Sequence, residues 1–280
     1  MFKAFEPGSL GIKTDFEGSL RLAREAGFEG VALDMGACER LGAEKVRDTL
    51  GTLGLRPGFW GLPVEFRKGE AEFRSGLETL RRQAELAERV GCERCVTWVL
   101  SFSDELPMKE NMERHRARLR DCAGILRDRG LRLGLEFLGP KTIRRGHRYE
   151  FVHTMEGMLE LCSLIGTGNV GLLLDSWHWY TSGGTVEALR ALRDESVVHV
   201  HVNDAPAGVP VDEQVDSRRA MPGETGVIDL AGFMGALAAI GYTGPVQVEP
   251  FSERVRAMGP LEAARAAAEA LARIMPASRR

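Results

Sequence analysis

Short runs of apolar residues alternate along the chain with longer segments in which apolar positions recur at helical spacing. The short runs predict β-strands, and the longer segments predict amphipathic helices. We expect eight strands, within residues 3–12 and at 30–34, 55–61, 95–100, 131–136, 170–175, 197–203 and 246–249. We also expect eight helices, at residues 16–26, 43–53, a segment ending near 90, 113–129, 155–165, 186–193, 229–240 and 260–275.

The regular alternation of strands and helices predicts βα units, and therefore a parallel sheet. The last five strands are apolar at both alternating positions, which is typical of strands that are buried on both faces. An open doubly wound sheet usually carries a glycine-rich phosphate turn, and the sequence has no GxGxxG or Walker pattern. No linker or change in composition interrupts the chain. We therefore expect an α/β protein with a single (β/α)8 TIM-barrel domain over residues 1–280.

Composition narrows the function classes further. The chain has 280 residues, 44% of them hydrophobic, and a net charge of −3. The slight negative charge argues against nucleic acid as a partner. No stretch approaches the roughly 20 apolar residues of a membrane span, and Met1–Glu6 shows no signal-peptide pattern. We expect a cytoplasmic protein that does not bind membranes.

The five cysteines are an odd number and are scattered along the chain. Cys92 and Cys95 form a CxxC pair, but the second pair that a zinc ribbon needs is missing. We therefore expect reduced, structural thiols.

Four consecutive predicted strands carry metal-binding residue types at their carboxyl ends: Glu136, Asp175, His201 and Glu249. In a parallel barrel these ends meet on one face. Three carboxylates and one imidazole form a hard ligand set, for which we expect Mn²⁺, with Mg²⁺, Co²⁺ and Zn²⁺ as alternatives. One acid at a strand end often only caps the next helix, but four such positions in succession favour a metal site.

The neighbouring histidines and tryptophans have less definite roles. His199 and His201 have the same side-chain parity, so alternation does not choose between them. His201 is nearer the strand end and is the better ligand, whereas His199 would be buried deeper and hydrogen-bonded. His178 could be a ligand or could bind a substrate oxygen, and we favour substrate binding. Trp177 and Trp179 flank it, and they either pack at the barrel rim or form a wall that faces a sugar.

Four segments resemble motifs of the xylose isomerase-like barrel superfamily. This superfamily contains sugar-phosphate isomerases and epimerases, with inosose isomerases and dehydratases among them. Residues 175–184 resemble its DxxHW…GG motif, 201–204 its HxxD segment, 221–230 its PGEGxID stretch with Thr225 as an extra residue, and 241–249 its GYxGxxxxE ending. The resemblance is strong over residues 131–251 and general before them. It is specific for the superfamily and not for a substrate.

The resemblance implies a divalent metal ion held by Glu136, Asp175, His201 and Glu249. In the epimerase branch the two glutamates are also catalytic, since one takes a proton alpha to a carbonyl and the other returns it. A chelated cation would stabilise the resulting enediolate by several kcal/mol.

His178 and an arginine of the loop at residues 204–228 would bind substrate hydroxyl groups. Arg218 and Arg219 are both candidates for this arginine, and we favour Arg219.

We therefore expect an isomerase or epimerase of a sugar, sugar phosphate or cyclitol ketone. A dehydratase of the inosose or dehydroshikimate type begins with the same proton abstraction, so the sequence does not separate the two. An abasic-site endonuclease of this superfamily would need further histidines, but none precedes His115, and the net charge opposes DNA binding. The retained acids Glu136 and Glu249 argue against a barrel that only binds a ligand.

The loop after the fifth predicted strand carries a run of basic side chains: Lys141, Arg144, Arg145, His147 and Arg148. Such a run is usually solvated, and the alternative is that it captures a phosphate or carboxylate of the substrate. The resemblance also implies a homo-oligomer, a dimer or tetramer.

Overall fold

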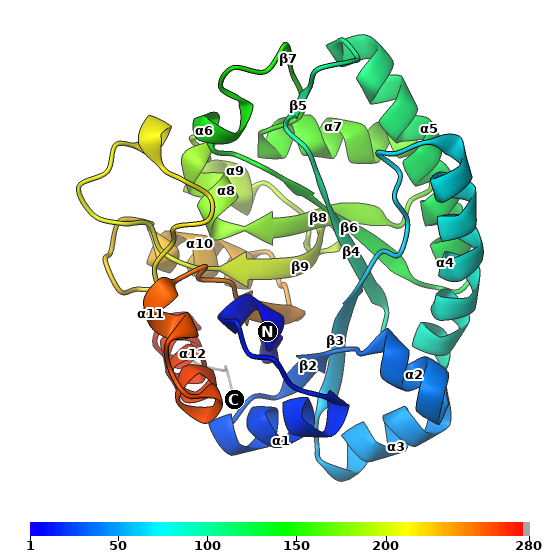
Figure 1. Ribbon diagram of the computed structural model, residues 1–280. Helices are drawn as coiled ribbons and strands as arrows, with labels where there is room; N and C mark the ends of the chain where they lie inside the picture. The colour runs from blue at the N-terminus through cyan, green and yellow to red at the C-terminus, as the bar shows by residue number, and fades with distance from the viewer. Residues whose placement is uncertain (277–280) are drawn as a thin grey trace.

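Eight parallel strands close into a barrel, and helices surround it (Figure 1). The computed structural model describes residues 1–276. Around the barrel the strands follow the order β1-β10-β9-β8-β6-β4-β3-β2, so the predicted (β/α)8 architecture is confirmed. The barrel strands are β1 Phe2–Phe5, β2 Gly30–Ala32, β3 Arg56–Gly61, β4 Arg94–Val99, β6 Arg132–Phe137, β8 Val170–Asp175, β9 Val197–Val202 and β10 Pro245–Val248.

The eight predicted helices are present, and local sequence signals set several of their ends. Asp15, Thr154 and Asp229 cap the first turns of α1, α7 and α10 through their side chains. The last helix, α12, has Pro260 at its start, as predicted, and it packs beside α1 (Figure 1). The bounds are α1 Phe16–Ala26, α3 Ala43–Thr52, α4 Glu70–Val90, α5 Met108–Arg127, α7 Met155–Ile165, α9 Val186–Arg190, α10 Leu230–Ala239 and α12 Pro260–Ile274.

The prediction of eight strands and eight helices counts too few elements. Two short strands, β5 (Phe102–Ser103) and β7 (Tyr149–Glu150), form a separate antiparallel pair that is not part of the barrel sheet. Short helices also interrupt the loops that were expected to be irregular. The longest of them, α2, has seven residues, and none of them shows a repeating amphipathic pattern in the sequence. They are α2 Met35–Leu41, α6 Lys141–Arg144, α8 Ser176–Thr181 and α11 Glu253–Arg256.

Side chains that point into the barrel form layers. Phe59, Val96 and Leu173 contact one another in an inner cluster, and the His199 ring lies 4.1 Å from the Phe59 ring. Alternate residues of a strand point to the same side. Two residues further along β4, β8 and β9, the next inward layer therefore holds Trp98, Asp175 and His201. This second layer lies at the carboxyl ends of the strands, where such barrels carry their chemistry.

All five cysteines are free, and four of them are fully buried. Burial raises the pKa of both the Cys92 and the Cys122 thiol to about 12, so both stay protonated and unreactive, as expected for structural thiols. Within residues 1–276, no helix combines the length and the apolar character that crossing a membrane requires.

Candidate metal centre and active site

Four side chains from different parts of the sequence meet at the mouth of the barrel. Glu136, Asp175, His201 and Glu249 each offer one ligand atom, and these atoms all lie within 4.8 Å of one another. Nδ1 of His201 lies 3.3 Å from Oε1 of Glu136 and 3.5 Å from Oε2 of Glu249. The structure therefore brings together all four residues that the strand ends identified.

The barrel order explains this convergence. The four residues belong to β6, β8, β9 and the residue after β10, and these strands are consecutive neighbours in the sheet. Asp175 and His201 are direct register partners across β8 and β9. Glu249 lies just beyond β10, and its backbone N–H donates to the carbonyl oxygen of Val202 at 3.1 Å. The result is an arc of ligands along one half of the mouth.

The donors fit a divalent cation. Glu136, Asp175 and His201 are buried, and the side chain of Glu249 is 18% exposed. Oε1 of Glu136 and both ring nitrogens of His201 have no hydrogen-bond partner among the described residues. Buried polar atoms normally have a partner, and a cation between these atoms would provide one. Three carboxylates and one imidazole are also the donor set that suits Mn²⁺, Mg²⁺, Co²⁺ or Zn²⁺.

Asp175 combines two roles that the sequence left as alternatives. Its Oδ1 caps α8 by accepting from the backbone N–H of Trp177 at 2.7 Å, and it also accepts from Nδ2 of Asn203 at 3.0 Å. Its Oδ2 faces the centre, 3.9 Å from Nδ1 of His201. One oxygen is therefore used for helix capping, and the other remains directed at the cluster.

Arg219, and not Arg218, lies against the centre. Its Nη1 donates to Oδ2 of Asp175 at 2.8 Å and to Oε2 of Glu249 at 3.0 Å. Its Nη2 donates to Oδ1 of Asp216 at 2.7 Å. Arg219 is buried, whereas Arg218 is exposed. A single guanidinium therefore holds two carboxylates of the cluster in a fixed orientation.

The three carboxylates of the cluster differ in proton affinity, because burial and neighbouring charges act on them to different extents. Burial raises the pKa of Glu136 above its ordinary value. Burial also acts on Asp175, but the charges of its neighbours, Arg219 above all, outweigh it and lower the pKa of Asp175 to about 2. Burial is likewise outweighed at Glu249, whose pKa is lowered chiefly by His201. The two glutamates therefore differ, because Glu136 takes up a proton more readily than Glu249.

His178 lies beside the cluster on the short helix α8 and is not one of the four converging residues. Its Nδ1 accepts from the backbone N–H of Gly139 at 3.2 Å, so the proton of the neutral ring is on Nε2. That nitrogen lies 3.8 Å from Oδ1 of Asp216 and 3.4 Å from Nη2 of Arg219. His178 thus presents an N–H group to the space beside the cluster, which is compatible with its predicted role in substrate binding.

His199, Trp177 and Trp179 are buried side chains that pack within the barrel and at its rim. His199 is fully buried, and its Nε2 lies 3.1 Å from Oε1 of Gln247, as expected for the deeper histidine. Trp177 is fully buried, and Trp179 packs against Phe233 with ring centroids 5.4 Å apart. Both tryptophans therefore pack at the rim and do not form a sugar-facing wall.

Two side chains of the basic loop form exposed ion pairs with acids of the loop at residues 204–228. Nζ of Lys141 lies 2.7 Å from Oδ2 of Asp212, and Nη2 of Arg145 lies 2.8 Å from Oε1 of Glu213. Oγ1 of Thr142 donates to the backbone oxygen of Gln214 at 2.7 Å. Lys141 and Arg145 therefore bind the loop that carries Arg219, and Figure 1 shows α6 beside this loop. We define these contacts as the loop clamp.

The sequence reasoning missed the role of Asp204. Its side chain accepts from the backbone N–H groups of Thr225, Gly226 and Ile228 at 2.8 to 3.0 Å. Asp204 thus fastens the far end of the loop at residues 204–228 to the end of β9. The HxxD segment contained the signal, since an acid placed after a strand end and before a long loop is well placed to bind backbone donors.

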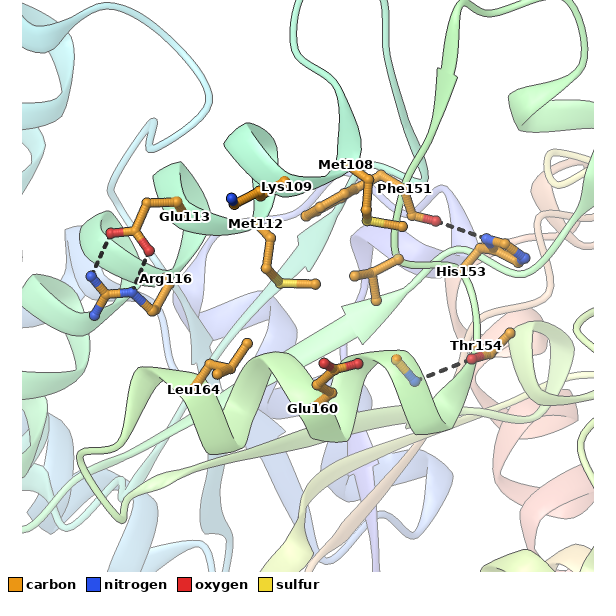
Figure 2. Close-up of a pocket in the computed structure, with 12 residues that line it drawn as sticks. Met108, Lys109, Met112, Glu113, Arg116, Phe151, His153, Thr154, Glu160 and Leu164 are labelled. Carbon is orange, nitrogen blue, oxygen red and sulfur yellow. Dashed lines mark hydrogen bonds and ion pairs between the residues drawn. The ribbon is translucent and has the colours of Figure 1, made fainter.

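An apolar pocket of about 510 Å³ lies elsewhere, between α5 and α7. Figure 2 shows Met108 and Met112 of α5 on one side and Leu164 of α7 on the other. Its lining includes none of the four converging residues, nor His178 or Arg219. The pocket is therefore separate from the candidate site.

Comparison with known proteins agrees with this architecture. Residues 20–274 match the sequence model of the family described as "Xylose isomerase-like TIM barrel". The chain is 29% identical over 187 residues to an inosose isomerase of Bacillus velezensis, covering 66% of this chain and 61% of that protein. It is 30% identical over 182 residues to a 3-dehydroshikimate dehydratase of Pseudomonas aeruginosa, covering 65% of this chain and 27% of that protein. The match thus spans less than two thirds of either relative.

A solved structure is similar over nearly the whole length. It is a xylose isomerase domain protein from Alicyclobacillus acidocaldarius subsp. acidocaldarius, with a TM-score of 0.88 and 31% sequence identity. The match covers 98% of both chains.

Proposed function

The chain belongs to the xylose isomerase-like TIM barrel family, and we propose that it is a divalent-metal-dependent isomerase or epimerase of a sugar or cyclitol ketone. The observation that carries the proposal is the convergence of Glu136, Asp175, His201 and Glu249 within 4.8 Å at the barrel mouth. The similarity to an inosose isomerase supports a polyol ketone as the substrate class. The substrate is a small molecule, and the net charge of −3 remains unfavourable for nucleic acid.

We assign the cation to the four converging side chains, with Mn²⁺ as the expected metal. When bound, the cation would act as a Lewis acid that stabilises negative charge on the substrate oxygens, an effect worth several kcal/mol. Glu136 and Glu249 would also act on the substrate itself. They come from the two ends of the ligand arc, β6 and β10, so a substrate bound between them has one carboxylate on each side.

In this proposal Glu136 takes the proton next to the carbonyl, and Glu249 returns a proton that it has first taken up from solvent. Burial raises the pKa of Glu136, which increases its affinity for the proton that it takes. His178 donates its Nε2–H to a substrate oxygen. Arg219 keeps Asp175 and Glu249 in place through the bonds of 2.8 and 3.0 Å described above. The position of the carboxylates matters because a base can take a proton from the substrate carbon only when it lies within hydrogen-bond distance of that proton.

A dehydratase is the second candidate, because the chain is similar to a 3-dehydroshikimate dehydratase. Such an enzyme removes the same kind of proton and then expels a hydroxyl group as water. The two reactions differ in their products, because an isomerase product keeps the mass of its substrate and a dehydratase product is lighter by one water.

The experiment is a substrate screen in deuterated water with added Mn²⁺. Inososes, ketoses, ketose phosphates and dehydroshikimate are each incubated with the enzyme and analysed by mass spectrometry and NMR. We expect deuterium at the carbon next to the carbonyl. Treatment of the enzyme with a chelator should abolish this incorporation. No deuterium in any compound at saturating Mn²⁺ would contradict the proposed function, and loss of water would select the dehydratase.

A further inference from the structure

Asp216 is an acid of the loop at residues 204–228 that lies beside the proposed site but is not one of the four converging residues. Its Oδ1 accepts from Nη2 of Arg219 at 2.7 Å, and its backbone oxygen accepts from Nε of the same guanidinium at 3.0 Å. Within residues 1–276 its Oδ2 accepts no hydrogen bond, and the side chain is 31% exposed. Asp216 is therefore held in place through one carboxylate oxygen, while the other is free to accept from a ligand.

The imidazole of His178 faces Asp216 and provides a complementary donor. Because Nδ1 of His178 accepts from the backbone N–H of Gly139, the proton of the ring is on Nε2. Nε2 lies 3.8 Å from Oδ1 of Asp216, which is too far for a hydrogen bond, and 3.4 Å from Nη2 of Arg219, which is itself a donor. His178 is 1% exposed, so its N–H is a buried donor without an acceptor in the part of the chain that the structure describes. Buried donors normally have a partner, which indicates that a ligand supplies the acceptor.

Arg219 connects Asp216 to the proposed metal centre. Its Nη2 bonds Asp216, while its Nη1 bonds Oδ2 of Asp175 at 2.8 Å and Oε2 of Glu249 at 3.0 Å. Both nitrogens belong to one planar group, so Asp216 lies next to the cluster. A polyol bound at the cluster can therefore place a further hydroxyl group between His178 and Asp216.

We infer that Asp216 is a specificity residue that recognises, together with His178, one substrate hydroxyl group that the cation does not bind. This inference rests on the proposed function and goes beyond it, because it makes a hydroxyl group away from the reacting carbon a requirement. A hydroxyl group is both an acceptor and a donor. It can accept the Nε2–H of His178 and donate to Oδ2 of Asp216, which satisfies both side chains. A substrate without that hydroxyl group leaves both unpaired and loses their contribution to binding.

The test is a thermodynamic cycle that combines Asp216→Asn with the removal of single hydroxyl groups from the substrate. The probes are an inosose and a set of monodeoxy-inososes, each lacking a different hydroxyl group. For the inosose we expect Asp216→Asn to lower kcat/KM by about 10- to 100-fold, because the amide presents N–H groups where the hydroxyl group needs an acceptor. One monodeoxy-inosose should lose about as much in wild type, and Asp216→Asn should lower its kcat/KM no further. Asp48→Asn, an exposed acid of α3 that also pairs with an arginine, is the control and should change nothing.

Asp216 also holds Arg219, and the cycle separates this effect from recognition of the substrate. If Asp216→Asn lowers kcat/KM for all probes by the same factor, the residue acts only through Arg219, and the inference is wrong. It is also wrong if kcat/KM for the inosose in Asp216→Asn stays within twofold of wild type.

Binding of the same probes to the Mn²⁺-loaded protein, measured by calorimetry, separates the inference from the proposed function. Coupling between Asp216→Asn and one deoxy position without deuterium exchange would support the inference and contradict the proposed reaction. Exchange without coupling would support the reaction and overturn the inference. Neither binding nor exchange would overturn both.

Discussion

At the scale of single residues, the proposed ligands differ in how the protein supports them. Asp175 accepts hydrogen bonds from Trp177, Asn203 and Arg219, so it is fixed without a cation. Glu136 is buried, and its Oε1 has no hydrogen-bond partner within the described part of the chain. Burial of an ionised carboxylate without a partner is unfavourable. Glu136 therefore has the most to gain from a bound cation or from the proton that it takes.

Glu136→Gln should lower deuterium incorporation by roughly 100-fold or more, because the amide cannot accept the proton. The change has nearly the same shape and removes a buried charge, so the thermal midpoint should not fall. Glu25→Gln, an exposed acid on α1, is the control for the loss of one negative charge. Incorporation at the wild-type rate in Glu136→Gln would exclude Glu136 as the base.

His115 links stability to pH at a distance from the proposed catalytic residues. It is buried on α5 between the rings of Phe66 and Phe151, and its Nδ1 lies 2.9 Å from the backbone oxygen of Asn111. Burial lowers the pKa of His115 from 6.5 to about 4. The folded protein therefore binds fewer protons at this position than the unfolded chain between these two values.

The contribution of neutral His115 to stability is therefore complete above pH 6.5 and is lost as the pH falls toward 4. In wild type the free energy of unfolding should decrease more steeply between pH 6.5 and 5 than in His115→Gln. The difference in slope should approach about 1.4 kcal/mol per pH unit. Urea unfolding at several pH values measures it, and identical slopes in the two proteins would contradict this assignment.

At the scale of elements, the loop at residues 204–228 is the segment that completes the site. It carries Asp216 and Arg219 to the mouth of the barrel, while Asp204 fastens its far end. The loop clamp then joins it to α6 through Lys141 and Arg145. Because the clamp pairs are exposed and screened by water, they contribute little to global stability. Their effect should be on the position of the loop.

The double variant Lys141→Ala/Arg145→Ala should loosen this loop without unfolding the barrel. We expect faster amide hydrogen exchange over residues 204–228, a higher KM and an unchanged thermal midpoint. Added salt should also raise the rate of amide exchange in this loop of the wild type, because salt screens the ion pairs of the clamp. Arg47→Ala/Arg127→Ala, which removes two exposed ion pairs with neighbouring acids, is the control. Unchanged exchange in the clamp variant would show that the pairs do not position the loop.

Helices and strands were predictable where the segment was long enough for its hydrophobic pattern to repeat. The barrel strands and the seven helices of ten residues or more follow from alternation and amphipathic spacing. The helix α8 was missed because it starts directly after β8, within the motif that contains His178. The clamp was missed because the acids Asp212 and Glu213 lie about 70 residues from their partners.

At the scale of the whole molecule, topology made the convergence of the proposed ligands predictable. A closed parallel barrel places the carboxyl ends of its strands on one face, so four strand-end residues had to approach one another. The sequence could not show which loop residues contact that face. Arg218 and Arg219 are adjacent, and only the structure shows that Arg219 is buried and Arg218 is exposed.

The account depends most directly on whether the arc of four residues binds one cation. Titration of chelator-treated protein with Mn²⁺, followed by isothermal calorimetry, measures this. We predict one equivalent per chain in wild type and in Asp216→Asn, which removes the charge that pairs with Arg219 but none of the four proposed ligands. Asp175→Asn should lose this binding. Equal Mn²⁺ binding by Asp175→Asn and wild type, or none in wild type, would contradict the account.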